Sequence, residues 1–390
     1  MSAVAQALVD KGVRIINPAS VEVADDVDPD RISGDGVVVH AGCRIRGPRT
    51  VISAGVHLGA EGPVTIEDCQ LGPAVKLKGG YAAAAVFLDG ANLGLGHHVR
   101  EGTILEEQAN GAHTVGLKQT ILFPFVTLGS LINFCDLLMA GGTSRSDHSE
   151  VGSSYIHFNF TPTGDKTTPS LFGDVARGVM LRERPIFLGG QGGAVGPVRV
   201  AYGTVVGAGS IVRDDITTEN ELHLVAPPSG VSRPLAAGGY PKLDAMLARN
   251  LAYLANLDAL EAWYRQARAP FFAAQPLGGM VLEGALGALA SARAERISRL
   301  TKLGAKLDPA DPRQAPVITA LPDLVRLFGA GTPSAPPGVL EPLVIGAGAA
   351  SYISAVKGLG DADAAAISGW LQGLVDDLGS RAGAILPTVG

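Results

Sequence analysis

Aliphatic residues recur every six positions in two separate parts of this chain. The positions of the first run are Ile15, Val21, Val27, Val39, Ile45 and Val51, with Ser33 as the one position of the series that is not apolar, and those of the second are Leu188, Ala194, Val200, Val206 and Val212. A period of six fits neither an amphipathic helix nor one long strand, but it fits a short strand and a tight turn that repeat. Stacked coils of this kind bury one aliphatic residue per repeat in a narrow, continuous core. The alternative is chance spacing in a Val/Gly-rich β-sandwich, whose strands come at irregular intervals of about 8–12 residues.

Glycine supports the repeat. The chain has 52 glycines among 390 residues, and an aliphatic residue followed by glycine recurs through the first half. These dipeptides are Leu58-Gly59, Leu71-Gly72, Leu93-Gly94, Val115-Gly116, Leu128-Gly129, Val151-Gly152 and Val206-Gly207. A residue without a Cβ lets the backbone turn tightly after each core position. We therefore predict a β-helix over residues 1–237.

The chain changes character at two places. The six-residue phase breaks between about 63 and 187, which predicts loops inserted into the β-helix, and such loops often carry function. After residue 238 the apolar residues recur at three and four, beginning with Leu243, Leu247 and Leu251, which predicts an α-helical domain to residue 390. A Pro-rich segment, "GAGTPSAPPGVLEP", divides that domain. It shows no catalytic motif, so we expect it to pack or to oligomerise.

Charge and cysteine usage exclude several classes of protein. A net charge of −6 gives no basic surface for nucleic acid. No apolar run approaches the 18 or so residues of a membrane span, and no signal peptide is evident, so we expect a cytoplasmic protein. The three cysteines are far apart, which argues against a disulfide framework or a zinc site. The pair His97-His98 has no carboxylate at ligand spacing, so no metal is expected.

Titratable and aromatic residues concentrate in "SDHSEVGSSYIHFNFTPTGDK", residues 146–166, inside the irregular zone. His148 is the candidate general base, because an imidazole takes up a proton near neutral pH. Asp147 or Glu150 could orient its ring, and Glu150 is better placed because adjacent strand residues point to opposite faces. The alternative is a surface histidine in a polar loop.

The strand that follows alternates in polarity. Tyr155, His157 and Asn159 share one face, which would line a groove between subunits or simply face solvent. Cations are scattered elsewhere in the first half: Lys166, Lys118, Arg100, Arg177, Arg182 and Arg184. Phosphate groups of a sugar nucleotide or of coenzyme A need such partners.

The six-residue pattern resembles the hexapeptide repeat of left-handed parallel β-helix proteins, in which three hexads form one triangular coil. Several segments are similar to the acetyltransferase half of the bifunctional N-acetylglucosamine-1-phosphate uridyltransferase and glucosamine-1-phosphate acetyltransferase family. The segments are "GVRIINPASVEV", "VREGTIL", "HTVGLKQTIL", "NFTPTGDK" and "TVVGAGSIVRDDI". This resemblance implies a homotrimer with active sites between subunits. It implies phosphate or substrate contacts at Arg100, Lys118, Asn159 and Lys166, acyl-CoA contacts near Phe160 and Ala208, and no metal.

The chain departs from that family at two positions. The family's base histidine aligns with Asn133 or Asp136, and the glutamate that pairs with the substrate lysine aligns with Gly116. The nucleotidyl loop of the uridyltransferase half is absent, so pyrophosphorylase activity is not expected of this chain alone. "DLLMAGGTSRSDHSEVG" is similar to the segment that holds the catalytic histidine in UDP-N-acetylglucosamine acyltransferases, and it places Asp147 or His148 there.

The sequence thus predicts a left-handed β-helix with an α-helical C-terminal domain that transfers an acyl group from acetyl-CoA or another acyl-CoA. The acceptor would be a sugar phosphate or a UDP-amino sugar. Arg182 and Arg184 would help to hold the coenzyme, and Asp136, His148 and His157 stay open as the base. The alternative function is a non-catalytic sugar-nucleotide-binding or scaffold protein that partners a separate nucleotidyltransferase.

Overall fold

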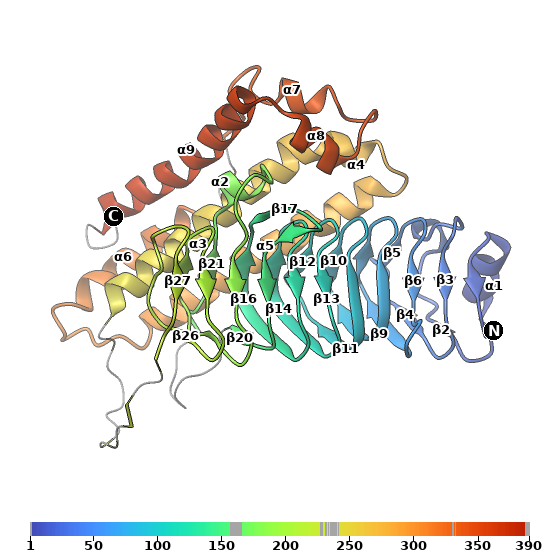
Figure 1. Ribbon diagram of the computed structural model, residues 1–390, viewed down its shortest axis with the longest axis horizontal. Coiled ribbons are helices and arrows are strands. Elements are labelled where there is room, and N and C mark those ends of the chain that lie inside the picture. Colours follow the sequence, from blue (N-terminus) through green and yellow to red (C-terminus); the bar gives the residue numbers. More distant parts are fainter. Residues whose placement is uncertain are drawn as a thin grey trace.

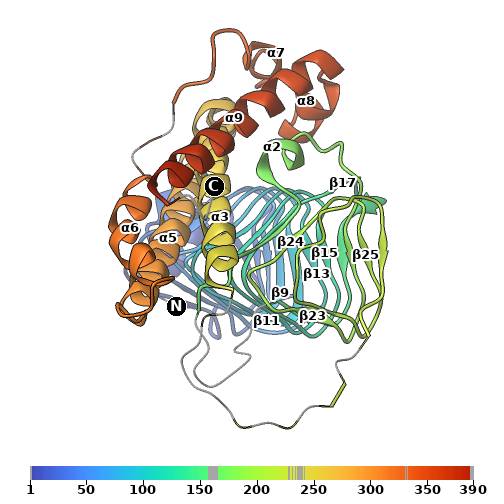
Figure 2. The ribbon, with the colours of Figure 1, turned by 90° about the vertical axis from the view of Figure 1, so that its left-hand side faces the viewer.

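The strands of the chain stack in parallel into a three-sided solenoid, and helices lie along one of its sides (Figure 1). This computed structural model describes residues 2–156, 166–226, 229, 230, 232, 234, 240, 242–329, 331 and 333–386. Figure 2 views the molecule after a 90° turn, with the coils one behind another and the helices to one side. The prediction of a parallel β-helix followed by helices is confirmed.

Each face of the solenoid is a column of short strands. Face 1 consists of β1 (Arg14–Ile15), β3 (Val38–Val39), β6 (His57–Leu58), the starts of β9 (Lys76–Ala83) and β11 (Asn92–Val99), β13 (Asn110–Gly111), β15 (Thr127–Leu128), β19 (Glu150–Val151), β22 (Phe187–Leu188), β25 (Val205–Val206) and β27 (Leu222–His223). Face 2 consists of β2 (Glu22–Val23), β4 (Arg44–Arg46), β7 (Val64–Glu67), the ends of β9 and β11, the starts of β14 (Val115–Leu122) and β16 (Ile132–Met139), β20 (Tyr155–Ile156), β23 (Gly193–Ala194) and β26 (Ile211–Val212). Face 3 consists of β5 (Val51–Ile52), β8 (Gln70–Leu71), β10 (Ala85–Phe87), β12 (Thr103–Leu105), the ends of β14 and β16, β21 (Ser170–Phe172) and β24 (Arg199–Val200).

The predicted core positions of the second run form inward rungs, whereas in the first run Val51 lies in the outward column of face 3, paired with Gln70. Leu188 pairs with Val206, and Ala194 pairs with Val212, a spacing of 18 residues or three hexads. All four side chains are buried. In the first run the phase slips at the corners, because Val23 rather than Val21 pairs with Ile45. One aliphatic side chain per strand therefore fills the solenoid, as the period of six predicts.

Glycine in the aliphatic–Gly dipeptides is required by close approach of neighbouring coils. Gly189 follows the inward residue Leu188 at the corner between faces 1 and 2. A Cβ at Gly189 would lie 2.4 Å from the backbone nitrogen of Ala208, and one at Gly152 would lie 2.6 Å from that of Gly190. No side chain fits at such separations, so the repeat needs glycine there for packing.

Three segments leave the regular coils between β16 and β22. The first, residues 140–149, forms a hairpin of β17 (Gly142–Ser144) and β18 (Asp147–His148). The second connects β20 to β21, and its residues 157–165 lie outside the described residues. The third carries the short helix α2 (Val175–Gly178). The domain boundary predicted at residue 237 also falls outside the described residues and stays a prediction.

Helices from both ends of the chain pack against the solenoid, at different places. The N-terminal helix α1 (Ala3–Asp10) buries Ala5 and Leu8 against the first coils. The later helical elements are α3 (Leu243–Trp263), a π-helical turn η2 (Tyr264–Arg268), α4 (Ala269–Ala273), α5 (Gly278–Gly304), α6 (Ala315–Arg326), α7 (Glu341–Val344), α8 (Tyr352–Gly358) and α9 (Asp361–Ile385). Of these, α5 packs on β8, β10 and β12 of face 3, and α3 packs on β21.

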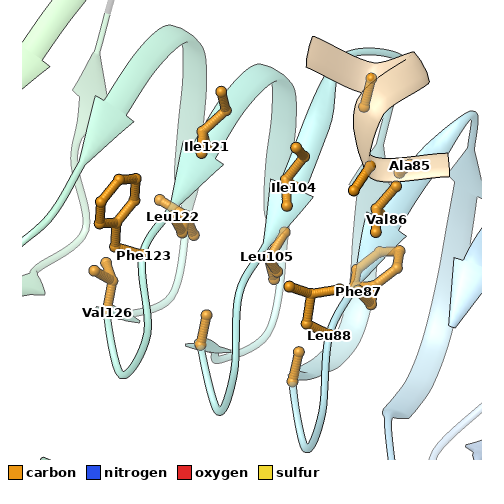
Figure 3. Close-up of a cluster of buried hydrophobic side chains, with 14 of the residues drawn as sticks. Ala85, Val86, Phe87, Leu88, Ile104, Leu105, Ile121, Leu122, Phe123 and Val126 are labelled. Atoms are coloured by element: carbon orange, nitrogen blue, oxygen red, sulfur yellow. The ribbon is translucent and has the colours of Figure 1, made fainter. Parts of the chain in front are cut away.

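Face 3 is covered because its outward side chains are apolar. Val86, Ile104 and Ile121 occupy neighbouring outward rungs, next to the inward residues Phe87 and Leu105 (Figure 3). All are at most 1% exposed. Each such side chain that is removed from water contributes about 1.5–3 kcal/mol. The helical region thus forms a second layer, which covers the outer surface of face 3 so that this face is buried on both sides.

Candidate functional site

The corner between faces 2 and 3 carries a column of cations. Arg100 ends the face 2 segment of one coil, and Lys118 occupies the next coil. Glu101 joins them, with its carboxylate 3.5 Å from Arg100 and 3.0 Å from the Lys118 ammonium. Partial burial would raise the pKa of Glu101, but the hydrogen bond from Lys118, a backbone hydrogen bond and the charges of Lys118 and Arg100 together outweigh burial, so the pKa is lowered. Glu101, which belongs to the neighbouring coil, therefore forms the ion pair with Lys118. Gly116, which aligns with the glutamate that pairs with this lysine in the family, has no side chain that could do so.

Asp136 lies at the same corner, one coil further on, in a left-handed conformation with a φ of 56°. Its carboxylate accepts hydrogen bonds from Arg296 of α5, at 2.7 Å, and from Thr168, at 3.2 Å. Arg296 also donates to the carbonyl oxygen of Lys166, at 3.3 Å. Asp136 and Arg296 are both buried, so this is an ion pair largely removed from water.

Face 2 beside this corner is open and polar. Tyr155 pairs in register with Asn133, and both occupy outward rungs. Asn133 is exposed and is one of the two positions that align with the family's histidine. Further towards the N-terminus the imidazole of His98 stacks on Tyr81, with ring centroids 5.1 Å apart. Polar and aromatic groups of this kind can contact a sugar ring.

The corner between faces 3 and 1 carries the predicted base. Asp147 accepts a hydrogen bond of 2.7 Å from Thr143 within the β17–β18 hairpin. The Nδ1 atom of His148 lies 3.2 Å from the carbonyl oxygen of Ser149, so a proton on Nδ1 would leave Nε2 as the basic nitrogen. Within the described part of the chain neither Asp147 nor Glu150 contacts the ring. Glu150 is the first residue of β19 on face 1, and its side chain is exposed.

The arginines of the third inserted segment have protein partners. Arg182 donates to Asp361, at 2.6 Å, and to the carbonyl oxygen of Leu359. Arg184 donates to Asn220, at 2.9 Å. Arg177 bridges two carboxylates and lies over the ring of Tyr202. These contacts fasten the segment to α9 and to the last coil, and the prediction that Arg182 and Arg184 hold coenzyme stays a prediction.

The predicted site residues therefore occupy three corners of the solenoid. Arg100 and Lys118 lie together at the corner of faces 2 and 3, the backbone of Lys166 lies near the same corner through its contact with Arg296, and Tyr155 lies on the adjoining face. His148 and its acidic neighbours lie at the corner of faces 3 and 1, so one chain does not bring them to the cations. Ala208 is exposed at the corner of faces 1 and 2. The remaining predicted residues, His157, Asn159 and Phe160, lie outside the described residues.

Two residues at the cationic corner were not predicted from the sequence. Glu101 is one, and Arg296 is the other. Arg296 is 160 residues from Asp136, and no local pattern links positions so far apart.

The described residues contain no group of three or more His, Cys, Asp or Glu side chains that could hold a metal ion.

Comparison with known proteins agrees with the solenoid. No protein-family model matches the chain. The bifunctional protein GlmU of Thermotoga petrophila is 27% identical over 213 residues, and that of Thermotoga maritima is 28% identical; each alignment covers 54% of this chain and 41% of the relative. The Mycobacterium tuberculosis protein of the same name is 25% identical over 205 residues.

The chain thus spans less than half the length of these curated relatives. Among the helices of the described residues, none is long and apolar enough to cross a membrane. Over about 54% of its length the chain is homologous to the bifunctional protein GlmU, consistent with the acetyltransferase half of that protein and with the hexapeptide-repeat solenoid.

Proposed function

We propose that the chain is an acyltransferase that moves an acyl group, most simply acetyl from acetyl-CoA, onto a sugar phosphate or nucleotide sugar. The observation that carries this proposal is the cationic corner where Arg100 and Lys118 flank Glu101 and the backbone of Lys166 lies close by, beside an open polar face. Phosphate oxygens are bound by such groups through charge-assisted hydrogen bonds. Homology to GlmU supports an enzyme of sugar-nucleotide metabolism.

The proposed reaction is a direct transfer. His148 removes a proton from the acceptor amine or hydroxyl as that atom attacks the thioester carbonyl of acyl-CoA. A C–N or C–O bond forms, the C–S bond breaks, and the proton passes from His148 to the departing thiolate. Backbone amides at the site stabilise the oxyanion of the tetrahedral intermediate, and the acyl-CoA arm lies along backbone groups near Ala208. The reaction requires no metal and no covalent enzyme intermediate.

A cytoplasmic homotrimer is part of this proposal. In one chain His148 and the cations lie at different corners of the solenoid. Side-by-side packing of parallel solenoids would place the corner of one subunit beside a face of the next. The active site would then form between subunits, with the base from one chain and the phosphate partners from its neighbour.

Asp136 is a weaker candidate for the base than His148. Its carboxylate is already bound by Arg296 and Thr168 and is buried with them. A base must reach the proton that it removes, and a carboxylate held in a buried ion pair does not. His148, in contrast, is half-buried at a corner.

A non-catalytic sugar-nucleotide-binding protein is the second candidate. It is favoured by the absence of a usable base at the two positions that align with the family's histidine. Asn133 cannot act as a base, and the carboxylate of Asp136 is held in an ion pair with Arg296. Such a protein could serve as a scaffold for a separate nucleotidyltransferase. It would bind the sugar ligand without turnover.

Release of free thiol from acetyl-CoA tests the two functions. The assay uses a panel of amino-sugar phosphates and UDP-sugars with the wild type and with His148→Ala. Turnover that falls by about 10²-fold or more in His148→Ala supports the transferase and its base. Equal turnover in the two proteins would move the base elsewhere. Absence of turnover with every acceptor, beside measurable binding of a UDP-sugar, would favour the binding protein.

A further inference from the structure

The helical region holds the backbone that carries Lys166. Arg296 of α5 donates to the carbonyl oxygen of Lys166, at 3.3 Å, and Asn250 of α3 donates to that of Thr167, at 3.1 Å. The hydroxyl of Thr167 lies 3.1 Å from the sulfur of Met246, also on α3. Residues 166–168 lead from an inserted segment back into face 3, so two helices fix the point at which the chain rejoins the solenoid.

A single guanidinium connects this segment to the neighbouring coil. Arg296 binds Asp136 and the Lys166 carbonyl oxygen together, and Thr168 binds the same Asp136. Arg296 is only 2% exposed, and Asn250 is fully buried. The planar fork of an arginine can satisfy two acceptors in fixed directions, which a lysine cannot. The geometry of the segment therefore depends on groups that the solenoid itself does not supply.

The same helix passes near the corner that holds the other lysine, Lys118. Glu295 precedes Arg296 on α5 and pairs with Arg299, at 2.6 Å. Burial would raise the pKa of Glu295, yet it is lowered by the Arg299 guanidinium, with a further contribution from the Lys118 ammonium. Arg296 of α5 pairs with Asp136, which lies one coil on from Lys118 at the same corner, so α5 runs close beside the column. The helix and the cations therefore belong to one structural unit.

We propose that α3 and α5 position Lys166 for phosphate binding, with Arg296 and Asn250 as positioning residues that act through the backbone of residues 166–168. This inference rests on the proposed function, because it takes the cationic column as the phosphate site. It gives the helical region a role in ligand recognition besides covering face 3. Ligand binding then requires no reorganisation of the Lys166 segment, because the helices hold this segment in place before the ligand arrives.

Amide hydrogen exchange tests the contact without any ligand. The variants are Arg296→Met and, because that change leaves Asp136 buried without its partner, the double variant Arg296→Met/Asp136→Asn. Arg293→Met is the matched control, since Arg293 lies one turn earlier on α5 and pairs with Asp258 and Glu261 but not with the solenoid. We expect faster exchange at residues 166–172 in both Arg296 variants and wild-type exchange there in the control.

Calorimetric binding of glucosamine 1-phosphate and of UDP-N-acetylglucosamine tests the consequence. Lys166→Ala should weaken binding by about tenfold or more, because it removes a charge-assisted contact. The Arg296 variants should weaken it similarly, and adding Lys166→Ala to them should cost less than about twofold further. This non-additivity is the signature of a residue that acts through Lys166. Arg293→Met should bind within about twofold of the wild type.

Three outcomes would overturn the inference, and they are distinguishable. If Arg296→Met/Asp136→Asn folds and binds like the wild type while Lys166→Ala does not, the helices do not position Lys166 although the phosphate site is real. If the wild type binds neither probe, the proposed function fails and this inference fails with it. Wild-type exchange at residues 166–172 in both Arg296 variants would likewise overturn the contact itself.

Discussion

The guanidinium of Arg268 donates a hydrogen bond of 3.0 Å to the carboxylate of Glu106, and both side chains are almost completely buried. Arg268 ends the π-helical turn η2, and Glu106 lies at a corner of the solenoid. Glu107 binds the same guanidinium, and the ring of Tyr352 lies 4.0 Å from its central carbon. This cluster fastens the helical region to the coils at one corner, as Arg296 and Asp136 do at another.

Replacing Arg268 with methionine should lower the free energy of unfolding by about 3–5 kcal/mol. The change leaves the buried carboxyl groups of Glu106 and Glu107 without the guanidinium that both bind, which is among the costliest single substitutions. Guanidinium chloride denaturation at neutral pH measures it. Arg381→Ala is the control, because the exposed pair of Arg381 with Asp377 should contribute at most about 1 kcal/mol. A loss below 1 kcal/mol in Arg268→Met would mean that the cluster does not hold the helices.

The same cluster predicts that stability falls as pH rises through neutrality. Burial, opposed by Arg268 and reinforced by the charges of Glu106 and Asp89, raises the pKa of Glu107 to about 8 from an ordinary value of 4.5. Between these values the folded state binds a proton that the unfolded state does not. Stabilisation from this group is therefore complete below about pH 4.5 and is lost as pH rises towards 8.

Unfolding free energies at several pH values between 5 and 9 check this slope. Glu107→Gln should flatten it, because the amide is uncharged at every pH and fits the same space. The difference between the two proteins isolates Glu107 from the neighbouring buried carboxyls Glu106 and Asp89, whose pKa values burial also raises; Tyr264, Tyr352 and Arg268 also face Glu107 but keep one protonation state across this pH range. Parallel pH profiles for the wild type and Glu107→Gln would contradict the assignment.

The inward rungs could be predicted from the sequence because each depends on local spacing. Leu188, Ala194 and Val200 lie six apart, and every one of them points into the core. The burial of the outer surface of face 3 also has a local signature in the sequence, separate from the six-residue period. Consecutive apolar pairs such as Val86-Phe87 and Ile104-Leu105 are typical of strands buried on both sides.

The contacts that complete the candidate site could not be predicted in the same way. Arg268 and Glu106 are 162 residues apart, and Arg296 and Asp136 are 160 apart. Each pair depends on how the helices lie across the solenoid, which hydrophobic periodicity does not specify. The periodicity of α5 predicts a helix, but not that Arg296 would reach the Lys166 segment.

Two glycine substitutions should change stability in opposite directions. Gly189→Ala should destabilise by about 1–3 kcal/mol, because its Cβ would meet the backbone of Ala208 in the next coil. Gly369→Ala should stabilise by up to about 1 kcal/mol, because Gly369 lies in α9 with nothing within 4 Å of the added Cβ. Thermal unfolding followed by circular dichroism compares them. A neutral Gly189→Ala would mean that the coils can separate at that corner without loss.

An apolar stripe on face 1 should determine the oligomeric state. Phe187, Val205 and Leu222 occupy successive outward rungs and are 38%, 40% and 64% exposed. Contiguous exposed apolar side chains usually mark an interface. Leu222→Lys should shift the proposed trimer towards monomer, measured as mass by light scattering after size exclusion. The control His57→Lys changes a polar outward rung of the same face and should leave the mass unchanged. An unaltered mass for Leu222→Lys would exclude this stripe from the subunit interface and direct the search to face 2.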